Sequence, residues 1–179
     1  MTSIELLTPD DFDVFLAYLN DHLSDNGRDG TGYFQPLSRE DSRFPADKAD
    51  AFKTGMRIEV GAPGWRRVWV ARDAEGRIAG HIDLRSHAER YAAHRCLLGM
   101  GVDRGQRKAG LGGRLMAHAQ QWASQSARLE WIDLQVLSSN TPAINLYLRS
   151  GFHKTGEIAG MFNIDGQLFS YTGMSKRLD

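Results

Sequence analysis

Cysteine is almost absent from the sequence: Cys96 is the only one, so no intramolecular disulfide can form. It lies in the apolar run Cys96-Leu97-Leu98, where we expect a small buried side chain rather than a reactive thiol. Long apolar runs are absent too, and none approaches the ~20 residues of a membrane-spanning helix. The first residues, Met1-Thr2-Ser3-Ile4, do not have the basic and then apolar pattern of a secretory signal. We therefore expect a cytoplasmic protein without membrane association.

An excess of charge of either sign is also lacking. Lys and Arg together number 22, as do Asp and Glu, so the formal net charge is zero. Binding of nucleic acid by bulk electrostatics requires a basic protein, so no nucleic-acid partner is expected. The six histidines are not spaced as HExxH or beside paired cysteines, so no metal site is expected. The length of 179 residues suits one domain, 1–179.

The N-terminal part predicts an edge strand over 4–7 and two helices. The segment Thr8-Pro9-Asp10-Asp11 offers a cap and a proline suited to the first helical turn. One apolar helix face follows, formed by Phe12, Phe15, Leu16, Leu19 and Leu23. Residues 24–44 are polar and irregular, and their Tyr33 and Phe34 either line a substrate pocket or attach this loop to the body of the protein. The second helix is predicted over 46–60.

The remainder alternates between strands and helices. Strands joined by tight turns predict antiparallel pairing, and strand–helix–strand order predicts a right-handed crossover with parallel pairing. The predicted fold is α/β, with a central mixed, mostly antiparallel sheet of about seven strands and helices on both faces. The elements are strands at 68–71, 78–86 and 96–102, a helix at 110–126, a strand at 129–136, a helix at 140–149, a strand from 152, and a strand at 168–174 after a turn at 164–167.

A basic, glycine-rich turn separates the strand that ends at Val102 from the next helix. Its sequence, Arg107-Lys108-Ala109-Gly110-Leu111-Gly112, fits Arg/Gln-x-x-Gly-x-Gly/Ala. Backbone N–H groups at a helix start have no partner within the helix, the dipole adds positive charge, and glycine permits close approach. The turn therefore predicts a phosphate or pyrophosphate site rather than a purely structural turn, within a basic patch of Arg104, Arg107, Lys108 and Arg114.

A second motif accompanies this turn. The segment from Asn140 to Phe152, NTPAINLYLRSGF, resembles the Asn-x-x-Ala-x-x-Leu-Tyr-x-x-x-Gly-Phe signature of the GNAT superfamily of N-acetyltransferases. The glycine turn resembles that family's acetyl-coenzyme A pyrophosphate loop, and Val102 precedes Arg107 by the five residues that the family has there. The resemblance covers about 68–174 and implies the GNAT fold, with a sheet splayed at the coenzyme site.

The resemblance also implies roles for individual residues. The backbone of Met100, Gly101 and Val102 would bind the pantetheine arm, and Asn140 would bond the coenzyme nearby. Tyr147 would be the general acid that protonates the departing thiolate, unless it is only a core aromatic; it follows Asn140 by two helical turns, so both can face one groove. The pyrophosphate would be held by the turn, that is by Arg107, Lys108, Ala109, Gly110, Leu111, Gly112 and Gly113.

The general base is left open by the sequence. Relatives that acetylate ribosomal proteins have a glutamate five residues before the motif asparagine, where this chain has Gln135. Others have a glutamate on the strand before the turn, where this chain is apolar. Asp133 and Asp83 are candidates with a carboxylate, and His81, His94 or a chain of water molecules are further alternatives.

The implied activity is transfer of an acetyl group from acetyl-CoA to a primary amine of a small molecule, amino acid or peptide, by direct attack in a ternary complex. One alternative is a protein N-terminal or lysine acetyltransferase, and another is a non-catalytic module that senses acyl-CoA. Homodimers are usual in the family, so a homodimer is a candidate assembly. The acceptor is expected to meet the 24–44 loop, the 81–94 region and the C-terminal hairpin, where Ser170-Tyr171-Thr172 replaces an acidic residue found in many relatives.

Overall fold

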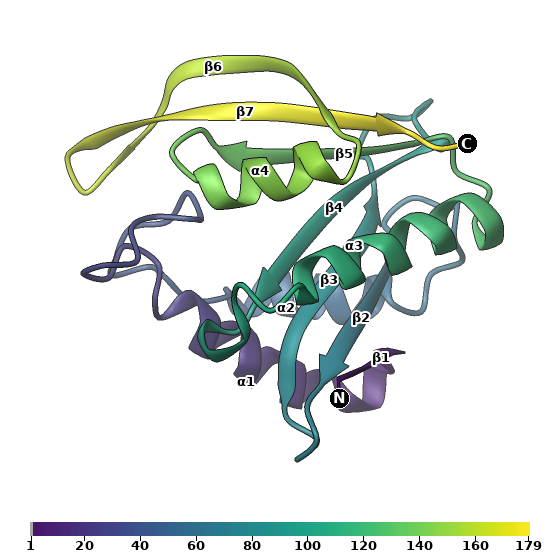
Figure 1. Ribbon diagram of the computed structural model, residues 1–179. Coiled ribbons are helices and arrows are strands. Elements are labelled where there is room, and N and C mark those ends of the chain that lie inside the picture. The colour runs from purple at the N-terminus through teal and green to yellow at the C-terminus, as the bar shows by residue number, and fades with distance from the viewer. Residues whose placement is uncertain (1) are drawn as a thin grey trace.

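Seven strands form a single sheet in the computed structural model, which describes residues 2–179 (Figure 1). Their order is β1-β2-β3-β4-β5-β7-β6, and all neighbours are antiparallel except β4 and β5. The strands are β1 (Ser3–Leu6), β2 (Arg66–Arg72), β3 (Ile78–Ser86), β4 (Arg95–Val102), β5 (Trp131–Leu137), β6 (His153–Ile164) and β7 (Gln167–Arg177). The helices are α1 (Phe12–Leu23), α2 (Ala46–Gly55), α3 (Leu111–Gln121) and α4 (Thr141–Arg149). The predicted mixed sheet, with its N-terminal strand at an edge, is confirmed.

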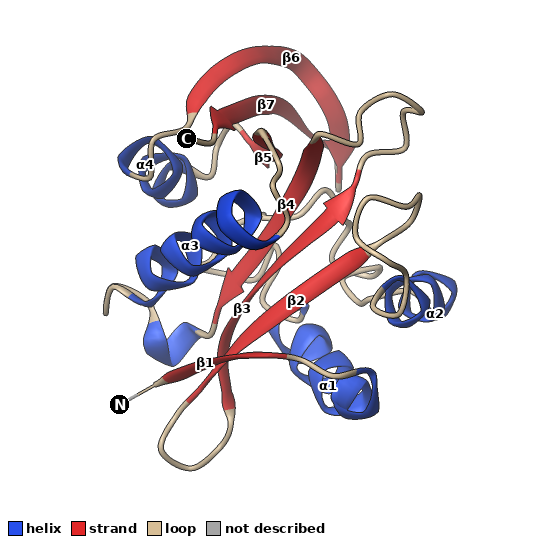
Figure 2. Cartoon of the chain, turned by 90° about the vertical axis from the view of Figure 1, so that its right-hand side faces the viewer, coloured by secondary structure: helices blue, strands red, loops and turns tan. Residues whose placement is uncertain are grey.

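Helices cover both faces of the sheet, as predicted: α1 and α2 lie on one side and α3 and α4 on the other (Figure 2). Because side chains alternate along a strand, Val68 and Val70 of β2 join the apolar cluster under α1 and α2. Trp69 and Ala71 join the larger cluster under α3. The predicted apolar face of α1 is confirmed at Phe12, Phe15, Leu19 and Leu23, which are buried, while Leu16 is partly buried.

The sheet opens between β4 and β5. These strands pair only where Arg95–Leu97 meets Trp131–Asp133, and the described residues show no ladder between them beyond that point. β5 continues instead along β7, with which it pairs over its whole length. The splayed sheet is therefore confirmed. The parallel pairing predicted from strand–helix–strand order holds for β4 and β5, but β5 and β6 are not neighbours because β7 lies between them.

Three predicted helix boundaries need correction. The second helix ends at Gly55 rather than at 60, and beyond its end the carbonyls of Met56 (3.2 Å) and Ile58 (3.0 Å) accept hydrogen bonds from the guanidinium of Arg67. The helix predicted over 110–126 is α3 followed by a π-helical turn over 122–126. Thr8 makes no capping bond, since its hydroxyl donates to the Asp11 carboxylate (3.1 Å). Within residues 2–179, no helix has the length and apolarity that spanning a membrane requires.

Leu115 offers a test of the packing between α3 and the sheet. It is fully buried in the larger cluster (0% exposed), so Leu115→Ala leaves a cavity and should lower the free energy of unfolding by about 2–5 kcal/mol. Chemical denaturation followed by circular dichroism measures this loss. The matched control is Val14→Ala on α1, where the side chain is 57% exposed, and the change should stay below about 0.5 kcal/mol. Equal losses in the two variants would contradict the packing described.

Candidate active site

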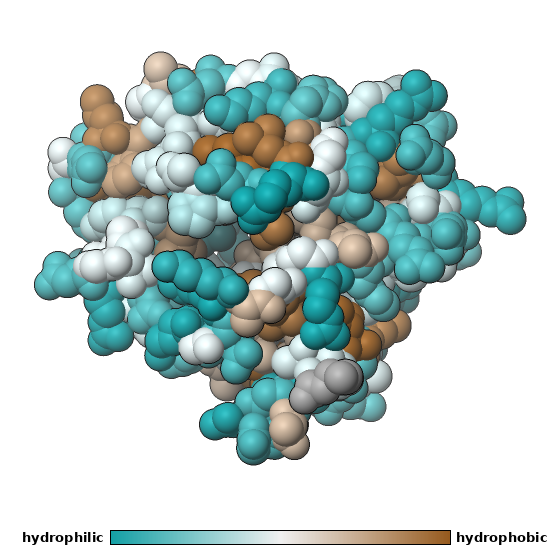
Figure 3. All heavy atoms as spheres, in the orientation of Figure 1, coloured by the Kyte–Doolittle hydropathy of each residue, from teal (hydrophilic) through white to brown (hydrophobic). Residues whose placement is uncertain are grey.

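A cavity of about 2350 Å³ crosses the opening between β4 and β5. Figure 3, drawn in the orientation of Figure 1, shows this side of the molecule hollowed near its centre, below α4. At one end, which we call the turn end, the walls are the glycine turn, the start of α3 and α4. At the other, the α2 end, they are residues 30–37, α2, β3 and β7. A single space therefore connects the predicted coenzyme site with the segments predicted to meet an acceptor.

The glycine turn leaves both donors and room at the turn end. Lys108 (φ 65°) and Gly110 (φ 78°) adopt left-handed conformations that redirect the chain into α3. The first backbone bond of α3 runs from Arg114 N to Gly110 O (3.2 Å), so the N–H groups of Leu111, Gly112 and Gly113 have no helical acceptor. No atom lies within 4 Å of where a Cβ would stand at Gly110 or Gly113. This arrangement fits a bound pyrophosphate.

Only part of the predicted basic patch faces this space. Arg104 is held elsewhere, because its Nε donates to Asp25 (2.6 Å) and its Nη2 to Asp21. Arg114 donates to the hydroxyl (2.6 Å) and carbonyl (2.8 Å) of Thr2. Arg107 and Lys108 line the cavity and remain available to an anion. The four-residue patch is thus corrected to two residues, because Asp25 and Thr2 compete for the others.

The exposed edge of β4 forms the floor between the two ends. Met100, Gly101 and Val102 line the cavity, and β5 has already separated from this part of β4. Apart from the Val102 carbonyl, which accepts from Nε of Arg107 (3.3 Å), the backbone groups on that edge are therefore free to bond an extended ligand as a neighbouring strand would. Gly101 is required by packing on the other side, since a Cβ there would lie 2.8 Å from Nε2 of His22 and 2.9 Å from Cε1 of His81.

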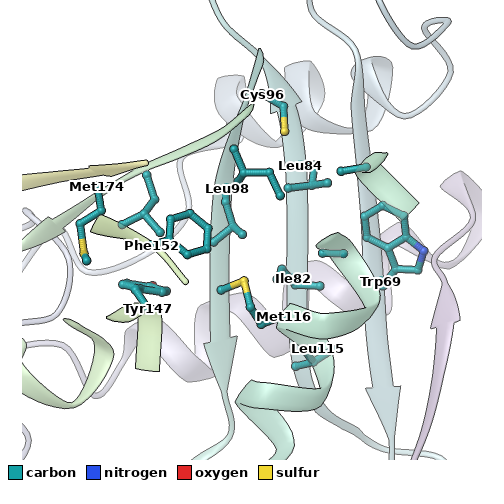
Figure 4. Packing of buried hydrophobic residues seen from close by; sticks show 14 of the residues in the cluster. Trp69, Ile82, Leu84, Cys96, Leu98, Leu115, Met116, Tyr147, Phe152 and Met174 are labelled. Carbon is teal, nitrogen blue, oxygen red and sulfur yellow. The ribbon is translucent and has the colours of Figure 1, made fainter. Parts of the chain in front are cut away.

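Helix α4 contributes the two motif residues to the cavity wall. Asn140 caps the helix, with its Oδ1 accepting from Ala143 N (3.4 Å), and it also lines the cavity. Tyr147 packs its ring against Phe152 (Figure 4). Burial raises the pKa of Tyr147 to about 12, and within residues 2–179 its hydroxyl has no hydrogen-bond partner. The ring is thus part of the core, while the protonated hydroxyl is free to donate to a ligand.

The base candidates separate into two groups. Asp83 and His81 are both buried in the wall of the cavity, whereas Asp133 and His94 are not among its lining residues. Burial favours a higher pKa for Asp133, but hydrogen bonds from Arg95, Ser175 and His87 outweigh it and hold that pKa below its usual value. Its carboxylate receives Nε of Arg95 at 2.7 Å and faces Nε2 of His87 at 2.8 Å. Asp133 of β5 therefore links β4 and β7, and the geometry favours Asp83 as the candidate base.

A cluster of α1 and β3 side chains was not anticipated from the sequence. The Tyr18 hydroxyl donates to the Gly101 carbonyl (3.3 Å) and contacts Nδ1 of His81 (3.3 Å). Burial, together with His22 and Arg66, lowers the pKa of His81 to about 3, and burial and Arg107 lower the pKa of His22 to about 4. Both rings are neutral at pH 7. The available signal was spacing, because Tyr18 and His22 lie four residues apart on the face that carries Phe15.

The 24–45 loop closes the α2 end. Asn26 is fully buried, and its amide bonds Gln35, Leu37 and Ser42 while its Oδ1 accepts from Phe34 N (2.8 Å) and Gln35 N (2.9 Å). The loop reaches the β6–β7 turn, where Asp165 accepts from the Tyr33 hydroxyl and from Arg39 N. Tyr33 and Phe34 both line the cavity and attach the loop, so the two predicted roles coexist.

The charged residues that line the cavity are mostly basic, although the chain as a whole carries no net charge. Basic side chains at both ends make the cavity suitable for anionic ligands. The acidic lining residues are Asp50 and Asp83, and the basic ones are Arg43, Lys48, Arg66, Arg85, Arg107, Lys108 and Arg149.

Comparison with known proteins identifies the family. The sequence model of the Acetyltransferase (GNAT) family matches residues 34–152. The chain belongs to the GNAT acetyltransferase family. GNAT enzymes take the acetyl group from acetyl-CoA, and the free N–H groups, the open space and the basic side chains of the turn suit that coenzyme.

Solved structures share the fold of this GNAT protein. A GNAT acetyltransferase from Streptococcus pneumoniae is 21% identical, with each chain covered over 100% and a TM-score of 0.81. A variant of the spermidine N-acetyltransferase SpeG from Vibrio cholerae is 16% identical, with 98% of this chain and 94% of that one covered and a TM-score of 0.70.

A curated relative matches over a shorter stretch. The N-terminal acetyltransferase A complex catalytic subunit NAA10 of Arabidopsis thaliana is 32% identical over 100 residues, which is 56% of this chain and 52% of that protein. This GNAT chain thus spans about half the length of the curated relative that it matches.

Gly113 tests the turn end of this GNAT site. The backbone there is an ordinary one and nothing beyond its own helix lies within 4 Å of a Cβ at this position, so a leucine would extend into the space beside the free N–H groups. Gly113→Leu should weaken coenzyme A binding at least ~10-fold, measured by calorimetry, while helix propensity keeps the fold at least as stable. Gly113→Ala should have a smaller effect. Unchanged affinity in the leucine variant would show that the coenzyme does not occupy this space.

His81 makes stability depend on pH. Its pKa is about 3 in the folded protein, below the 6.5 of an unfolded chain, so between these values the unfolded state binds more protons. Stability should therefore fall as the pH is lowered below 6.5, by up to about 1.4 kcal/mol per pH unit for this residue. Thermal unfolding from pH 7 to 4 should show a shallower dependence for His81→Gln, whereas exposed His153→Gln should keep the full dependence. Identical slopes for His81→Gln and the parent protein would refute the assignment.

Proposed function

We propose that this acetyltransferase transfers the acetyl group of acetyl-CoA directly to the primary amine of a small molecule, with both substrates bound together. The continuity of the cavity carries this proposal. It joins the turn end, where Arg107 and Lys108 suit a pyrophosphate, to the α2 end across the free edge of β4. Two ligands that enter from opposite ends would meet at β4, with Tyr147 on one side and Asp83 on the other.

Different residues are proposed to bind different parts of the coenzyme. The N–H groups of Leu111, Gly112 and Gly113 would bind the pyrophosphate, with charge from Arg107 and Lys108, while Ala109 shapes the turn. The edge of β4 at Met100–Val102 would pair with the pantetheine arm, and Asn140 would bond it from α4. Support for this division comes from the unpaired donors and from the open space at Gly110 and Gly113.

The proton transfers are assigned to two side chains. As the amine nitrogen bonds to the acetyl carbon, its proton passes to Asp83 or to water held beside it. The carbon–sulfur bond breaks, and the departing thiolate receives the proton of the Tyr147 hydroxyl. That hydroxyl carries its proton at neutral pH, as an unperturbed tyrosine does, and burial raises its pKa further to about 12. Cys96 is not a nucleophile in this scheme, since it is fully buried and burial raises its pKa to about 12.

The closed α2 end supports a small acceptor. The 24–45 loop meets the β6–β7 turn through Tyr33, Arg39 and Asp165, so a bridge of residues crosses this end of the cavity and limits its width. A protein N-terminal acetyltransferase is the second candidate, favoured by the 32% identity to NAA10. Assays with small amines and with a panel of peptides, following free thiol release, would separate the two. Turnover restricted to peptides would favour the second candidate.

A homodimer is also proposed, on the evidence of β6. This strand forms an edge of the sheet, and its Ile158 and Met161 are about half exposed (52% and 48%). Exposed edge strands with apolar side chains are sites where a second chain can pair. Light scattering of the purified protein measures the mass directly.

Tyr147→Phe tests the proposed general acid. Removing one hydroxyl keeps the ring in the core, so kcat should fall by about 10²–10⁴-fold, while coenzyme A affinity changes less than ~10-fold, the range of a single lost neutral hydrogen bond. Stopped-flow thiol release and calorimetry provide the two readouts. The control is Tyr91→Phe, where the side chain is 83% exposed and kcat should not change. Unchanged thioester cleavage in Tyr147→Phe would show that this tyrosine is not the general acid. If the parent protein binds the coenzyme but shows no turnover, the protein would instead be an acyl-CoA sensor.

A further inference from the structure

Two arginines face one another at the α2 end of the cavity. Arg66 of β2 and Arg85 of β3 are directly opposed in the sheet, an arrangement that is unfavourable for like charges. One carboxylate lies between them: Oδ1 of Asp83 is 3.5 Å from Nη1 of Arg66 and 3.3 Å from Nη1 of Arg85. The three side chains therefore carry one net positive charge.

This positive charge is largely removed from bulk water. The side chain of Asp83 is 7% exposed, that of Arg66 22% and that of Arg85 34%. The Arg66 guanidinium stacks on the Phe52 ring at 3.9 Å, which fixes its position. Burial lowers the pKa of Arg66, Asp83 only partly offsets this, and Arg85 lowers it further. A partly buried, incompletely balanced charge is stabilised by an anionic ligand.

The two arginines lie far from the glycine turn that is proposed to bind the pyrophosphate. Arg85 pairs with Leu97, five residues along β4 from Val102, or about 16 Å at the rise of a strand. Asp83 lies beside Gly99, where a Cβ would stand 2.5 Å from its Oδ2 and 3.4 Å from Nη1 of Arg85. The absent side chain at Gly99 thus leaves room for the Asp83 carboxylate to pack directly against β4, at the point where β4 and β5 separate.

We propose that the acceptor is an amino carboxylate, such as a free amino acid, whose carboxylate binds Arg66 and Arg85 while its amine lies at Asp83, directed toward β4. This inference rests on the proposed function and specifies its acceptor. With its amine deprotonated, as attack on the thioester requires, such a ligand carries one negative charge and balances the excess positive charge, and guanidinium groups bind carboxylates through paired hydrogen bonds. A polyamine would add positive charge beside both arginines, and an amide would leave them unbalanced.

The test compares each standard amino acid with its carboxamide, with spermidine and short peptides as further acceptors, by acetyl-CoA-dependent thiol release. The parent enzyme should prefer its best amino acid over the matching carboxamide at least ~10-fold in kcat/KM. Arg85→Gln should lower kcat/KM for the amino acid about 10–100-fold, the range expected for a lost charge-assisted hydrogen bond. It should lower kcat/KM for the carboxamide far less, so the preference should collapse. The matched control, Arg57→Gln, changes an exposed arginine that does not line the cavity and should keep the preference.

The outcomes separate this inference from the function on which it rests. Turnover of carboxamides, spermidine or peptides at least as fast as of amino acids overturns the inference and leaves the acetyltransferase intact. Equal losses for acid and amide in Arg85→Gln, or loss of coenzyme A affinity, also overturn it. Failure of every amine to release thiol overturns both. The preference of the parent enzyme for amino acids over carboxamides tests the inference even if a variant fails to fold. Circular dichroism shows whether each variant is folded.

Discussion

The ion-pair network around Asp133 fixes the geometry on which the site depends. Asp133 of β5 receives two hydrogen bonds from the guanidinium of Arg95 on β4, another from Ser175 on β7, and faces His87. A bidentate arginine–carboxylate pair is both strong and directional. The network lies where β4 and β5 still pair, and beyond it the two strands separate. It therefore sets the point from which the sheet opens.

Much of the functional geometry follows from that opening. A continuous sheet would pair the edge of β4 with β5 and leave no backbone groups for a ligand. Separation frees this edge, while glycines at 99 and 101 leave room for buried polar side chains behind it: Asp83 at the first, His22 and His81 at the second. The strand thus has two different sides at one place, with a backbone edge toward the coenzyme and a polar wall toward α1 and α2. The proposed reaction requires both.

The sequence predicted those features that are encoded within short segments. The glycine turn and the Asn140–Tyr147 helix were placed correctly because strand ends, caps and apolar spacing are local properties. The predicted end of α2 was wrong. The carbonyls of Met56 and Ile58 accept hydrogen bonds from Arg67, a contact across the fold that no local helix-stop signal reveals. The role of Asn26 at the centre of the loop depends on its burial, which no local pattern in the polar, irregular segment indicates.

The acceptor side could not be predicted for a related reason. Arg66 and Arg85 lie nineteen positions apart in the printed sequence and become partners only through the register of β2 and β3. Asp133 and Asp83 are similar as sequence candidates, since each alternates onto the same face as polar neighbours. Their surroundings distinguish them: Asp133 is held by donors of β4, β7 and the segment after β3 and does not line the cavity, whereas Asp83 lies on the cavity wall between two arginines.

Asn26 gives the 24–45 loop an unusual physical character. Its one buried amide group lies within hydrogen-bond distance of polar atoms of four residues, Phe34, Gln35, Leu37 and Ser42. Because these bonds share a single side chain, they form and break together, and the loop behaves as a small cooperative unit with its own local unfolding equilibrium. The loop over the α2 end would therefore open as one unit rather than residue by residue. Its tolerance to sequence change is governed by whether a substitution keeps that amide buried.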